Sequence, residues 1–242
     1  MIDIATLIDD LSRNEDFMRQ VAHLERVAPR EGRYADFPPG IHPALTDALG
    51  KSGVSRLYVH QREAYEAVAA GKNTVIVTPT ASGKTLCYNL PVLQTLLSDR
   101  DSRALYLFPT KALSQDQQSE LNTIINASSL PLPVHTYDGD TPSSVRIAAR
   151  KTGRIVISNP DMLHAGILPN HPRWIKFISA LRFIVIDEIH TYRGVFGSHM
   201  ANLIRRLLRV TRFYGAEPVF ICCSATIGNP KELTEQVLGA PV

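Results

Sequence analysis

A short loop carries the residue types that bind nucleotide phosphates. Residues 78–85 read TPTASGKT, and they follow an apolar run at 73–77 and precede an amphipathic stretch. In a strand–loop–helix arrangement, the backbone N–H groups of the loop and the amino terminus of the helix hold a phosphate. Lys84 would reach the β- and γ-phosphates, and the Thr85 hydroxyl would bind Mg²⁺. The residues predicted to hold a nucleotide are Thr80, Ala81, Ser82, Gly83, Lys84 and Thr85.

This loop departs from the phosphate-loop pattern G-x-x-x-x-G-K-[ST]. Thr78 stands at the first glycine of the pattern, and Ala81 stands where related loops often have glycine. Taken alone, the segment therefore leaves open an ordinary glycine-containing turn between a strand and a helix.

A pair of carboxylates ends another apolar run, FIVID at residues 183–187. Asp187 at the strand tip can hold Mg²⁺ through water, and Glu188 can orient or deprotonate an attacking water molecule. His190 can couple this site to neighbouring elements. A solvated acidic turn is the alternative for an isolated Asp-Glu pair, but a phosphate loop earlier in the same chain favours hydrolysis of ATP or GTP.

A third polar segment, CCSAT at 222–226, follows the last apolar run. The hydroxyl groups of Ser224 and Thr226 can hydrogen-bond the acidic motif and relay the state of the nucleotide. The alternative is a Ser/Thr helix cap or turn.

Six short apolar runs must position these residues. They span 73–77, 104–108, 134–137, 154–158, 183–187 and 219–223. Most are continuously apolar, which is typical of strands that are covered on both faces of a parallel sheet. Helical patterns lie between them at 84–97, 111–126, 142–150 and 192–211. The alternation predicts an α/β fold with an open, mainly parallel sheet, helices on both faces, and ligands beyond the carboxyl ends of the strands.

The amino-terminal part has a different pattern. Its apolar residues recur at helical spacing, which predicts a helix to about Ala28. A Pro- and Gly-rich connector at 29–43 and a short helix at 44–49 follow. We therefore assign 1–50 to a helical extension with its connector, and 51–242 to the nucleotide-binding domain.

The composition excludes several classes of protein. Of 242 residues, 44% are hydrophobic and 20% are charged, and the net charge is +3. A disordered chain is thereby excluded, no apolar run is long enough for a membrane span, and the first residues lack the pattern of a secretory signal. The mildly basic balance permits nucleic-acid binding without requiring it. The three cysteines, Cys87, Cys222 and Cys223, have no disulfide or metal-ligand spacing, which indicates reduced intracellular thiols.

The motifs TPTASGKT, DEIH and SAT, in this order, resemble motifs I, II and III in the first RecA-like domain of superfamily 2 helicases. The segment HQREA at 60–64 is similar to their Q motif. The resemblance implies a RecA-like P-loop NTPase fold with ATP and Mg²⁺ as cofactors. It also implies that Gln61 reads the adenine edge, with Tyr58 as a stacking partner.

Three further loops resemble elements that follow a nucleic-acid backbone in this superfamily: motif Ia at 109–117, and the Ib and Ic elements at 137–142 and 158–163. The contacts that the resemblance implies are Pro109, Thr110, Lys111, Gly139, Asp140, Thr141, Ser158, Asn159 and Pro160. Such contacts position a strand without reading its bases, so we expect little sequence preference and strong salt dependence. Ordinary turns remain the alternative for each loop.

The segment VIDEIHTYRGVFGSHMANLIRRLLR at 185–209 is similar to the mitomycin-repair helicase family, which comprises the bacterial MrfA (YprA) proteins and their fungal RecQ4-like relatives. YDGDTP at 137–142 and SATIGNP at 224–230 fit this family as well. The resemblance implies an ATP-dependent 3′-to-5′ DNA helicase or translocase that acts on single-stranded DNA, in repair of mitomycin-type damage and interstrand crosslinks. It also implies a cytoplasmic bacterial protein that is nucleoid-associated when it acts.

Members of that family continue into a second RecA-like domain with an arginine finger, and into a zinc-binding region with four cysteines. We find neither pattern here, so we expect this chain to be the first motor lobe, nearly inactive alone. The implied partners are single-stranded DNA and the second RecA-like domain of the same polypeptide. We expect no membrane partner and no small-molecule substrate besides ATP.

Three other functions compete with this interpretation. An RNA helicase lobe would carry the same backbone-following motifs, because contacts to the 2′-OH distinguish the two nucleic acids. A nucleotide-dependent binding module that does not hydrolyse is disfavoured by the presence of both Lys84 and Glu188. A P-loop kinase or GTPase is disfavoured because no guanine-reading motif is found and because DEIH and SAT would have no role in it.

Overall fold

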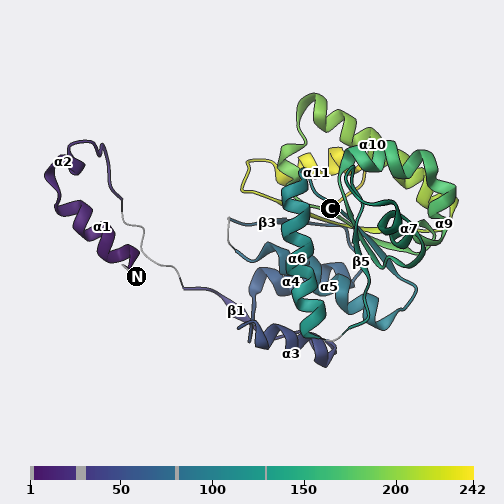
Figure 1. The fold of residues 1–242 in the computed structure, drawn as a ribbon, viewed down its shortest axis with the longest axis horizontal. Coiled ribbons are helices and arrows are strands. Elements are labelled where there is room, and N and C mark those ends of the chain that lie inside the picture. The colour runs from purple at the N-terminus through teal and green to yellow at the C-terminus, as the bar shows by residue number, and fades with distance from the viewer. Residues whose placement is uncertain (1–2, 26–30, 80–81, 129) are drawn as a thin grey trace. The chain divides into compact units, whose positions relative to one another are not determined.

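The computed structural model describes residues 3–25, 31–79, 82–128 and 130–242. It divides the chain into two compact units, Met1–Gly32 and Arg33–Val242 (Figure 1). Residues 33–50, which the sequence pattern assigns to the amino-terminal extension, belong to the larger unit. The reason is that α3 (Pro43–Lys51) buries Leu45, Ala48 and Leu49 in the core of that unit.

Among its described residues, 3–25 and 31–32, the smaller unit contains two helices, α1 (Ile4–Arg13) and α2 (Glu15–Met18). The prediction of one helix to about Ala28 is therefore wrong in its extent; residues 26–30 lie outside the described part of the chain. Asn14 interrupts the helix with an extended backbone, and its side chain accepts a hydrogen bond from the Phe17 N–H. Asparagine is a favoured residue at this capping position, which is why a second helix begins here.

The larger unit is built on a six-stranded parallel sheet with the order β3-β8-β7-β4-β6-β5. The strands are β3 (Thr74–Val77), β4 (Arg103–Leu107), β5 (Val134–Thr136), β6 (Ile155–Ser158), β7 (Leu181–Ile186) and β8 (Val219–Ser224). All six predicted strands are present, with small shifts at their ends. The predicted open parallel α/β sheet is therefore confirmed.

Helices cover both faces of this sheet (Figure 1). One face packs against α3, α4 (Val59–Ala69), α5 (Lys84–Ser98) and α6 (Lys111–Ala127). The other packs against α8 (Pro160–Met162), η1 (Leu163–Ile167), η2 (Leu168–Trp174), α9 (Ile175–Ile178), α10 (Gly194–Phe213) and α11 (Pro230–Leu238), with Ala149 of α7 (Ser143–Thr152). Among the described helices, none combines the length and the apolar character that a bilayer crossing requires.

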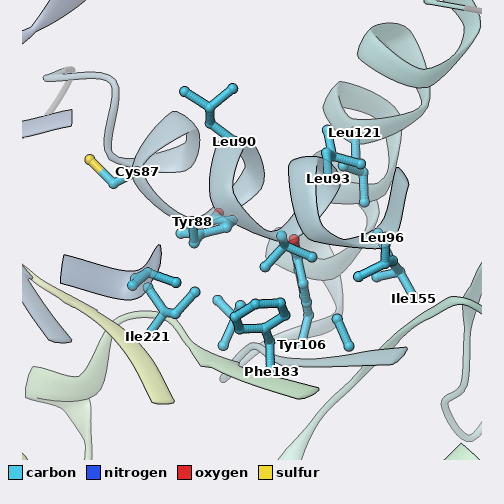
Figure 2. Close-up of a cluster of buried hydrophobic side chains, with 14 of the residues drawn as sticks. Cys87, Tyr88, Leu90, Leu93, Leu96, Tyr106, Leu121, Ile155, Phe183 and Ile221 are labelled. Atoms are coloured by element: carbon cyan, nitrogen blue, oxygen red, sulfur yellow. The ribbon is translucent and has the colours of Figure 1, made fainter. Parts of the chain in front are cut away.

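Strand residues alternate between two hydrophobic clusters, because successive side chains point to opposite faces of a sheet. Tyr106 and Cys223 belong to the cluster beneath α5, whereas Leu105 and Cys222 belong to the opposite cluster. Figure 2 shows the first of these, in which α5 side chains such as Leu93 lie over the strands. Burial on both faces explains why the strands read as continuously apolar runs. The two adjacent cysteines, Cys222 and Cys223, therefore point to opposite faces of the sheet.

A second, two-stranded sheet was not predicted. In it β1 (Tyr34–Ala35) pairs antiparallel with β2 (Leu57–Tyr58), so that Tyr34 stands opposite Tyr58. Strands of two residues are too short to show a hydrophobic period, and Tyr34 lies in the stretch that composition marks as a connector. The pairing brings part of this stretch beside the start of α4.

Candidate nucleotide site and nucleic-acid track

The phosphate loop, the acidic motif and the Ser-Ala-Thr segment all lie at the carboxyl edge of the parallel sheet. Val77 at the end of β3 is in register with Ser224 at the end of β8, and Ile186 at the end of β7 is in register with Cys222. The three motifs follow these strand ends directly. Segments that are far apart in the sequence are thereby brought to one place, as the sequence pattern predicts.

Lys84 lies between two of these strand ends. Its ammonium group donates to the Thr78 carbonyl and to the Ser224 carbonyl, each at 3.4 Å. Both hydrogen bonds are long for a charged donor. Two neutral carbonyls at this distance hold the ammonium in place without neutralising its charge.

Glycine at position 83 is required by geometry. Gly83 adopts φ +71° directly before the first residue of α5, and a Cβ atom there would lie 2.6 Å from Nε2 of Gln61. Only glycine adopts this backbone conformation at little cost. The first N–H groups of α5, a helix of 15 residues, have no partner within the helix and form a site for an anion.

Gln61 connects the phosphate loop to the segment before α4. Its amide nitrogen donates to the Gly83 carbonyl at 2.9 Å, and its amide oxygen accepts from the Tyr58 N–H at 2.8 Å. The neighbouring His60 ring lies 3.0 Å from the Ser82 carbonyl, and the Ser82 hydroxyl donates to Thr78 at 2.6 Å. The predicted loop residues Thr80 and Ala81 lie outside the described residues.

A cavity of about 500 Å³ adjoins this loop. Its lining includes Tyr34, Tyr58, Gln61, Gly83, Thr85 and Glu120. The rings of the two tyrosines stack with their centroids 5.0 Å apart. An aromatic surface beside an amide and a phosphate-binding helix is the arrangement that a nucleotide base and its phosphates require.

The sequence offered no reason to place Tyr34 or Glu120 in this cavity. Tyr34 had no motif around it, and only the β1–β2 pairing places it against Tyr58. Glu120 lies in the middle of α6, and burial raises the pKa of its carboxyl group, while hydrogen bonds from Gln117 and Thr85 lower it. A single Glu in an amphipathic helix carries no signal in the sequence.

The acidic motif combines burial with charge. Burial raises the pKa of the Asp187 carboxyl group to about 6, and the charge of Glu188 adds to this, whereas the Glu188 N–H and Lys84 oppose it. The Glu188 N–H donates to Asp187 at 2.8 Å. Asp187, Glu188 and Lys84 therefore lie close enough to interact electrostatically, as predicted from their positions at strand ends.

Glu188 has a strained backbone. Its φ of 52° is the only positive value among the described residues other than glycine. A left-handed conformation costs a residue with a side chain about 1–2 kcal/mol. Such strain is typical of sites where the position of a side chain is fixed by function.

His190 joins the acidic motif to the Ser-Ala-Thr segment. Its Nδ1 atom lies 3.2 Å from the Glu188 carboxylate and accepts from the Ala225 N–H at 3.1 Å. One ring nitrogen cannot donate and accept at once, so a neutral ring with its proton on Nε2 binds Ala225, and a Nδ1-protonated ring binds Glu188. The position of this proton therefore decides which of the two motifs the ring contacts.

The predicted hydroxyl contacts from Ser224 and Thr226 to the acidic motif are not found among the described hydrogen bonds. The Ser224 hydroxyl is buried and donates to the Ala225 carbonyl at 2.8 Å, and Thr226 is exposed. The physical link between the two motifs runs instead through the backbone N–H of Ala225 and the His190 ring. A backbone donor at this position cannot be recognised from side-chain types.

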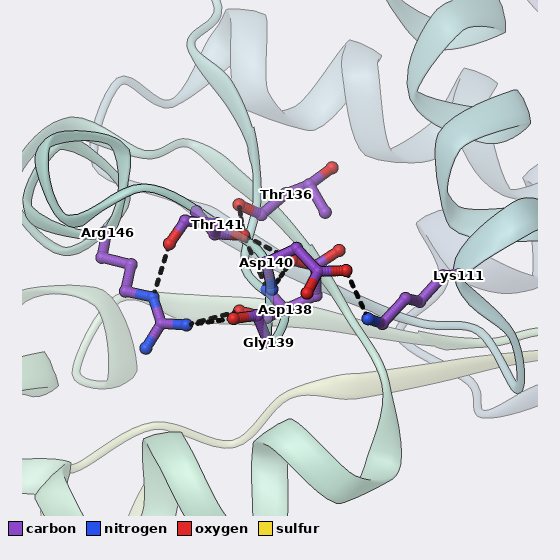
Figure 3. Close-up of polar contacts among 7 residues, drawn as sticks. All are labelled: Lys111, Thr136, Asp138, Gly139, Asp140, Thr141 and Arg146. Carbon is purple, nitrogen blue, oxygen red and sulfur yellow. Dashed lines mark hydrogen bonds and ion pairs between the residues drawn. The ribbon is translucent and has the colours of Figure 1, made fainter.

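The loops predicted to follow nucleic acid lie at the carboxyl ends of β4, β6 and β5, on the other half of the same sheet edge. Lys111 and Asp140 form an ion pair at 2.5 Å, and both side chains are exposed. Arg146 donates to the carbonyls of Thr141, Asp138 and Gly139 at 2.8–2.9 Å. Figure 3 shows these contacts, which hold the 138–141 loop between α6 and α7.

The structure corrects the prediction for two of the nine candidate contacts. The Ser158 side chain is 1% exposed, and its hydroxyl donates to the Tyr137 carbonyl at 2.7 Å. Pro160 is also buried, at the start of α8. Asn159 is half-buried and caps α8 by accepting from the Met162 N–H. The buried side chains of Ser158 and Pro160 therefore pack beneath this loop. They are not exposed for contact with a nucleic-acid strand.

The sequence profile of DEAD/DEAH box helicases matches residues 58–233, most of the larger unit. The chain belongs to this family. It is similar to the ATP-dependent helicase YprA of Bacillus subtilis, with 55% identity over 239 residues that cover 99% of this chain and 31% of that protein. The ATP-dependent helicase HRQ1 of Saccharomyces cerevisiae is 38% identical over 242 residues, which cover 98% of this chain and 22% of that protein.

Solved helicase structures show the same fold. The crystal structure of the helicase MrfA bound to DNA and AMPPNP matches with a TM-score of 0.91 and 55% identity, over 99% of this chain and 33% of that chain. The Mycobacterium smegmatis helicase Lhr bound to single-stranded DNA and AMP-PNP matches with a TM-score of 0.70 and 28% identity, over 83% of this chain and 27% of that chain. The predicted RecA-like fold and the resemblance to the MrfA and YprA helicases are confirmed. This DEAD/DEAH box domain spans about a third or less of the relatives it matches.

Proposed function

We propose that residues 33–242 are the first motor lobe of an ATP-dependent DNA helicase that moves along single-stranded DNA from 3′ to 5′. One observation carries the proposal: a single sheet edge bears the nucleotide motifs at β3, β8 and β7, and the candidate track at β4, β6 and β5. β7 of the nucleotide half and β4 of the track half are hydrogen-bonded neighbours. A conformational change at the nucleotide site can therefore be transmitted to the track over a short distance.

In this proposal the nucleotide lies over the amino terminus of α5. Lys84 binds the β- and γ-phosphates, and the backbone N–H groups of Ser82 to Thr85 hold the phosphate oxygens. The base lies in the cavity beside Tyr58, Tyr34 and Gln61. Gln61 has one amide hydrogen and one oxygen lone pair left after its two hydrogen bonds, so it can still read the edge of adenine.

Thr85 and Asp187 would hold Mg²⁺. A hydroxyl and a carboxylate are oxygen ligands, which this cation prefers, and it keeps several waters and phosphate oxygens besides a few protein ligands. When bound, the ion neutralises charge on the phosphates.

Glu188 would act as the base for the attacking water. Its carboxylate is held by the strained backbone and by the neighbouring His190 ring. Asp187 would bind the metal ion instead, and burial raises the pKa of its carboxyl group. A nearby divalent cation would favour the ionised form of Asp187 and so lower this pKa.

The remainder of the longer polypeptide would supply an arginine that stabilises the charge on the γ-phosphate. In phosphoryl-transfer enzymes such an arginine contributes about 10³–10⁵ in rate. We therefore expect residues 1–242 alone to bind ATP weakly and to hydrolyse it very slowly. Brisk DNA-stimulated hydrolysis by this monomeric fragment would contradict the two-lobe proposal.

The nature of the nucleic acid is proposed from two lines of support. The similar structures are of MrfA bound to DNA and of Lhr bound to single-stranded DNA, and residues 185–209 resemble the mitomycin-repair helicases. On the same resemblance we propose action on mitomycin-type damage and interstrand crosslinks, in the bacterial cytoplasm at the nucleoid.

The test is made on the full-length protein. Its ATP hydrolysis should be stimulated by single-stranded DNA more than by RNA of the same sequence. Strand displacement should occur on a duplex with a 3′ single-stranded tail and not on one with a 5′ tail. Equal or greater stimulation by RNA would favour an RNA helicase, and displacement from the 5′ tail alone would contradict the proposed polarity.

A further inference from the structure

A basic surface lies on the flank of the larger unit, where α7 and α9 pack against each other (Figure 1). Two cavities, of about 380 and 630 Å³, lie here and share Arg150 and Arg173 in their linings. Lys151 and Lys176 line the second cavity, and Arg146 lines the first. We call these five cations and the area between them the basic flank.

Four cations of the basic flank, Arg150, Lys151, Arg173 and Lys176, lie in cavities whose described lining contains no carboxylate. The described ion pairs include none formed by Arg150, Lys151, Arg173 or Lys176. Elsewhere on the surface, Arg62 and Lys231 each pair with a glutamate one helical turn away. Like charges gathered without counter-charges repel one another, so the arrangement costs stability unless an anion is bound.

The basic flank continues the candidate nucleic-acid track. Arg146 stands one helical turn before Arg150 on α7, and Arg146 holds the carbonyls of Asp138, Gly139 and Thr141 in the loop after β5 (Figure 3). β5 is the edge strand of the sheet. A single DNA strand that passes from the loops at β4, β6 and β5 over this edge of the sheet would therefore contact α7 first.

Two apolar side chains lie among the cations. Ile147 is 45% exposed and Ile175 is 50% exposed, and both line the second cavity. An exposed apolar side chain between cations gives sugars or bases a surface to pack on while their phosphates meet the charges. This combination is typical of surfaces that hold a single strand without reading its sequence.

We propose that the basic flank binds the phosphate backbone of a single DNA strand beyond the β5 loop and so lengthens the track of this lobe. The inference rests on the proposed function for the presence of DNA. It adds a binding surface on α7, η2 and α9 that none of the helicase motifs includes. An acidic polypeptide would meet the same charges, and the experiment separates the two occupants.

The experiment uses the full-length protein and direct binding of fluorescent oligodeoxynucleotides at several salt concentrations. The flank variant carries Arg150→Ala, Arg173→Ala and Lys176→Ala. The control variant carries Lys72→Ala, Arg182→Ala and Arg209→Ala, three exposed cations outside the basic flank. Both variants lose three positive charges, so they differ only in where the charges are removed.

With a long oligonucleotide, the slope of log K against log salt should be shallower by about 2 in the flank variant, since each lost phosphate contact removes about 0.7. The control should keep the slope of the unmodified protein, because its three cations line neither cavity of the basic flank. With an oligonucleotide too short to pass the β5 edge, all three proteins should bind alike. Thermal unfolding of each variant checks that it is folded.

Equal slopes for the flank and control variants on the long strand would overturn the inference. So would a flank variant that binds DNA normally but loses binding to a polyglutamate peptide, since that result assigns the surface to an acidic polypeptide. Binding is measured directly, so the slopes still test the basic flank if DNA fails to stimulate ATP hydrolysis, which is the result that would refute the proposed function.

Discussion

The two halves of the sheet edge use polar groups in opposite ways. At β3, β8 and β7 the charged groups are only partly satisfied: Lys84 has two long hydrogen bonds, Glu188 has a left-handed backbone, and burial raises the pKa of Asp187 to about 6. At β4, β6 and β5 the polar groups satisfy one another, as shown by Ser158 and by the three carbonyls bound to Arg146.

The difference follows from what each half has to do. A site for phosphoryl chemistry gains from charges that are placed before the substrate arrives, because they need no rearrangement when charge develops. A track for a backbone gains from a rigid loop whose position is fixed, because its contacts only position the strand. The nucleotide half therefore carries an electrostatic cost in the free protein, whereas the track half has a loop whose conformation is fixed by hydrogen bonds.

The largest expected effect is on hydrolysis. In the full-length protein, Glu188→Gln should lower kcat by about 10²–10⁴, because the base that accepts the proton of the water is lost. Nucleotide binding should remain, since Lys84 and the α5 amino terminus are unchanged. Steady-state hydrolysis and binding of a fluorescent nucleotide measure the two effects. Glu217→Gln, an exposed carboxylate elsewhere, is the control; unchanged kcat in Glu188→Gln would remove this residue from the site.

The electrostatic cost of ionising the buried Asp187 can be measured through the free energy of unfolding. The pKa of Asp187 is about 6 in the folded state against an ordinary value of 3.8. The folded state therefore binds the proton more tightly, and the contribution of Asp187 to stability is present below pH ~4 and is lost as the pH rises through about 6. At pH 8, without nucleotide or Mg²⁺, Asp187→Asn should raise the free energy of unfolding by about 3 kcal/mol, since each unit of pKa difference corresponds to about 1.4 kcal/mol.

Urea unfolding at two pH values checks this prediction. The gain from Asp187→Asn should shrink toward zero near pH 4, where the native carboxyl group is already protonated. Asp116→Asn, on the exposed side of α6, should change stability little at either pH. A loss of stability at pH 8 would show that the ionised Asp187 is favourable in this site and would weaken the contrast between the two halves.

Gly83 allows the strain of the phosphate loop to be separated from its contacts. Gly83 and Gly215 have φ of +71° and +80°, so alanine at either position should cost about 1–2 kcal/mol of stability. Only at Gly83 would the new Cβ lie 2.6 Å from Gln61, whereas nothing lies within 4 Å at Gly215. Gly83→Ala should therefore also weaken ATP binding, by about tenfold for one lost hydrogen bond. Equal ATP affinity in both variants would show that the Gln61 contact does not matter for binding.

Much of this site follows from the sequence, for a physical reason. Parallel strands buried on both faces produce apolar runs, and the polar residues that follow them, such as Lys84 and Asp187, must meet at one edge. Tyr34 could not be predicted, because a two-residue strand pairing places it. Ser158 was predicted as a nucleic-acid contact but is buried, since a motif gives the order of residues and does not show whether a hydroxyl points inward. The contact between Ala225 and His190 uses a backbone N–H that every residue except proline has.

The smallest expected effect concerns the exposed ion pair of the track half. Lys111→Ala should leave thermal unfolding unchanged, because exposed ion pairs contribute little to stability. Its affinity for single-stranded DNA should fall, with a salt slope shallower by about 0.7. Asp140→Ala should have the opposite effect, since it removes a negative charge beside the strand and frees the Lys111 ammonium from its partner. DNA titrations of both variants decide between two roles for the pair. Opposite changes in affinity would show that Asp140 masks a phosphate contact, whereas equal losses would show that the pair serves to hold the loop.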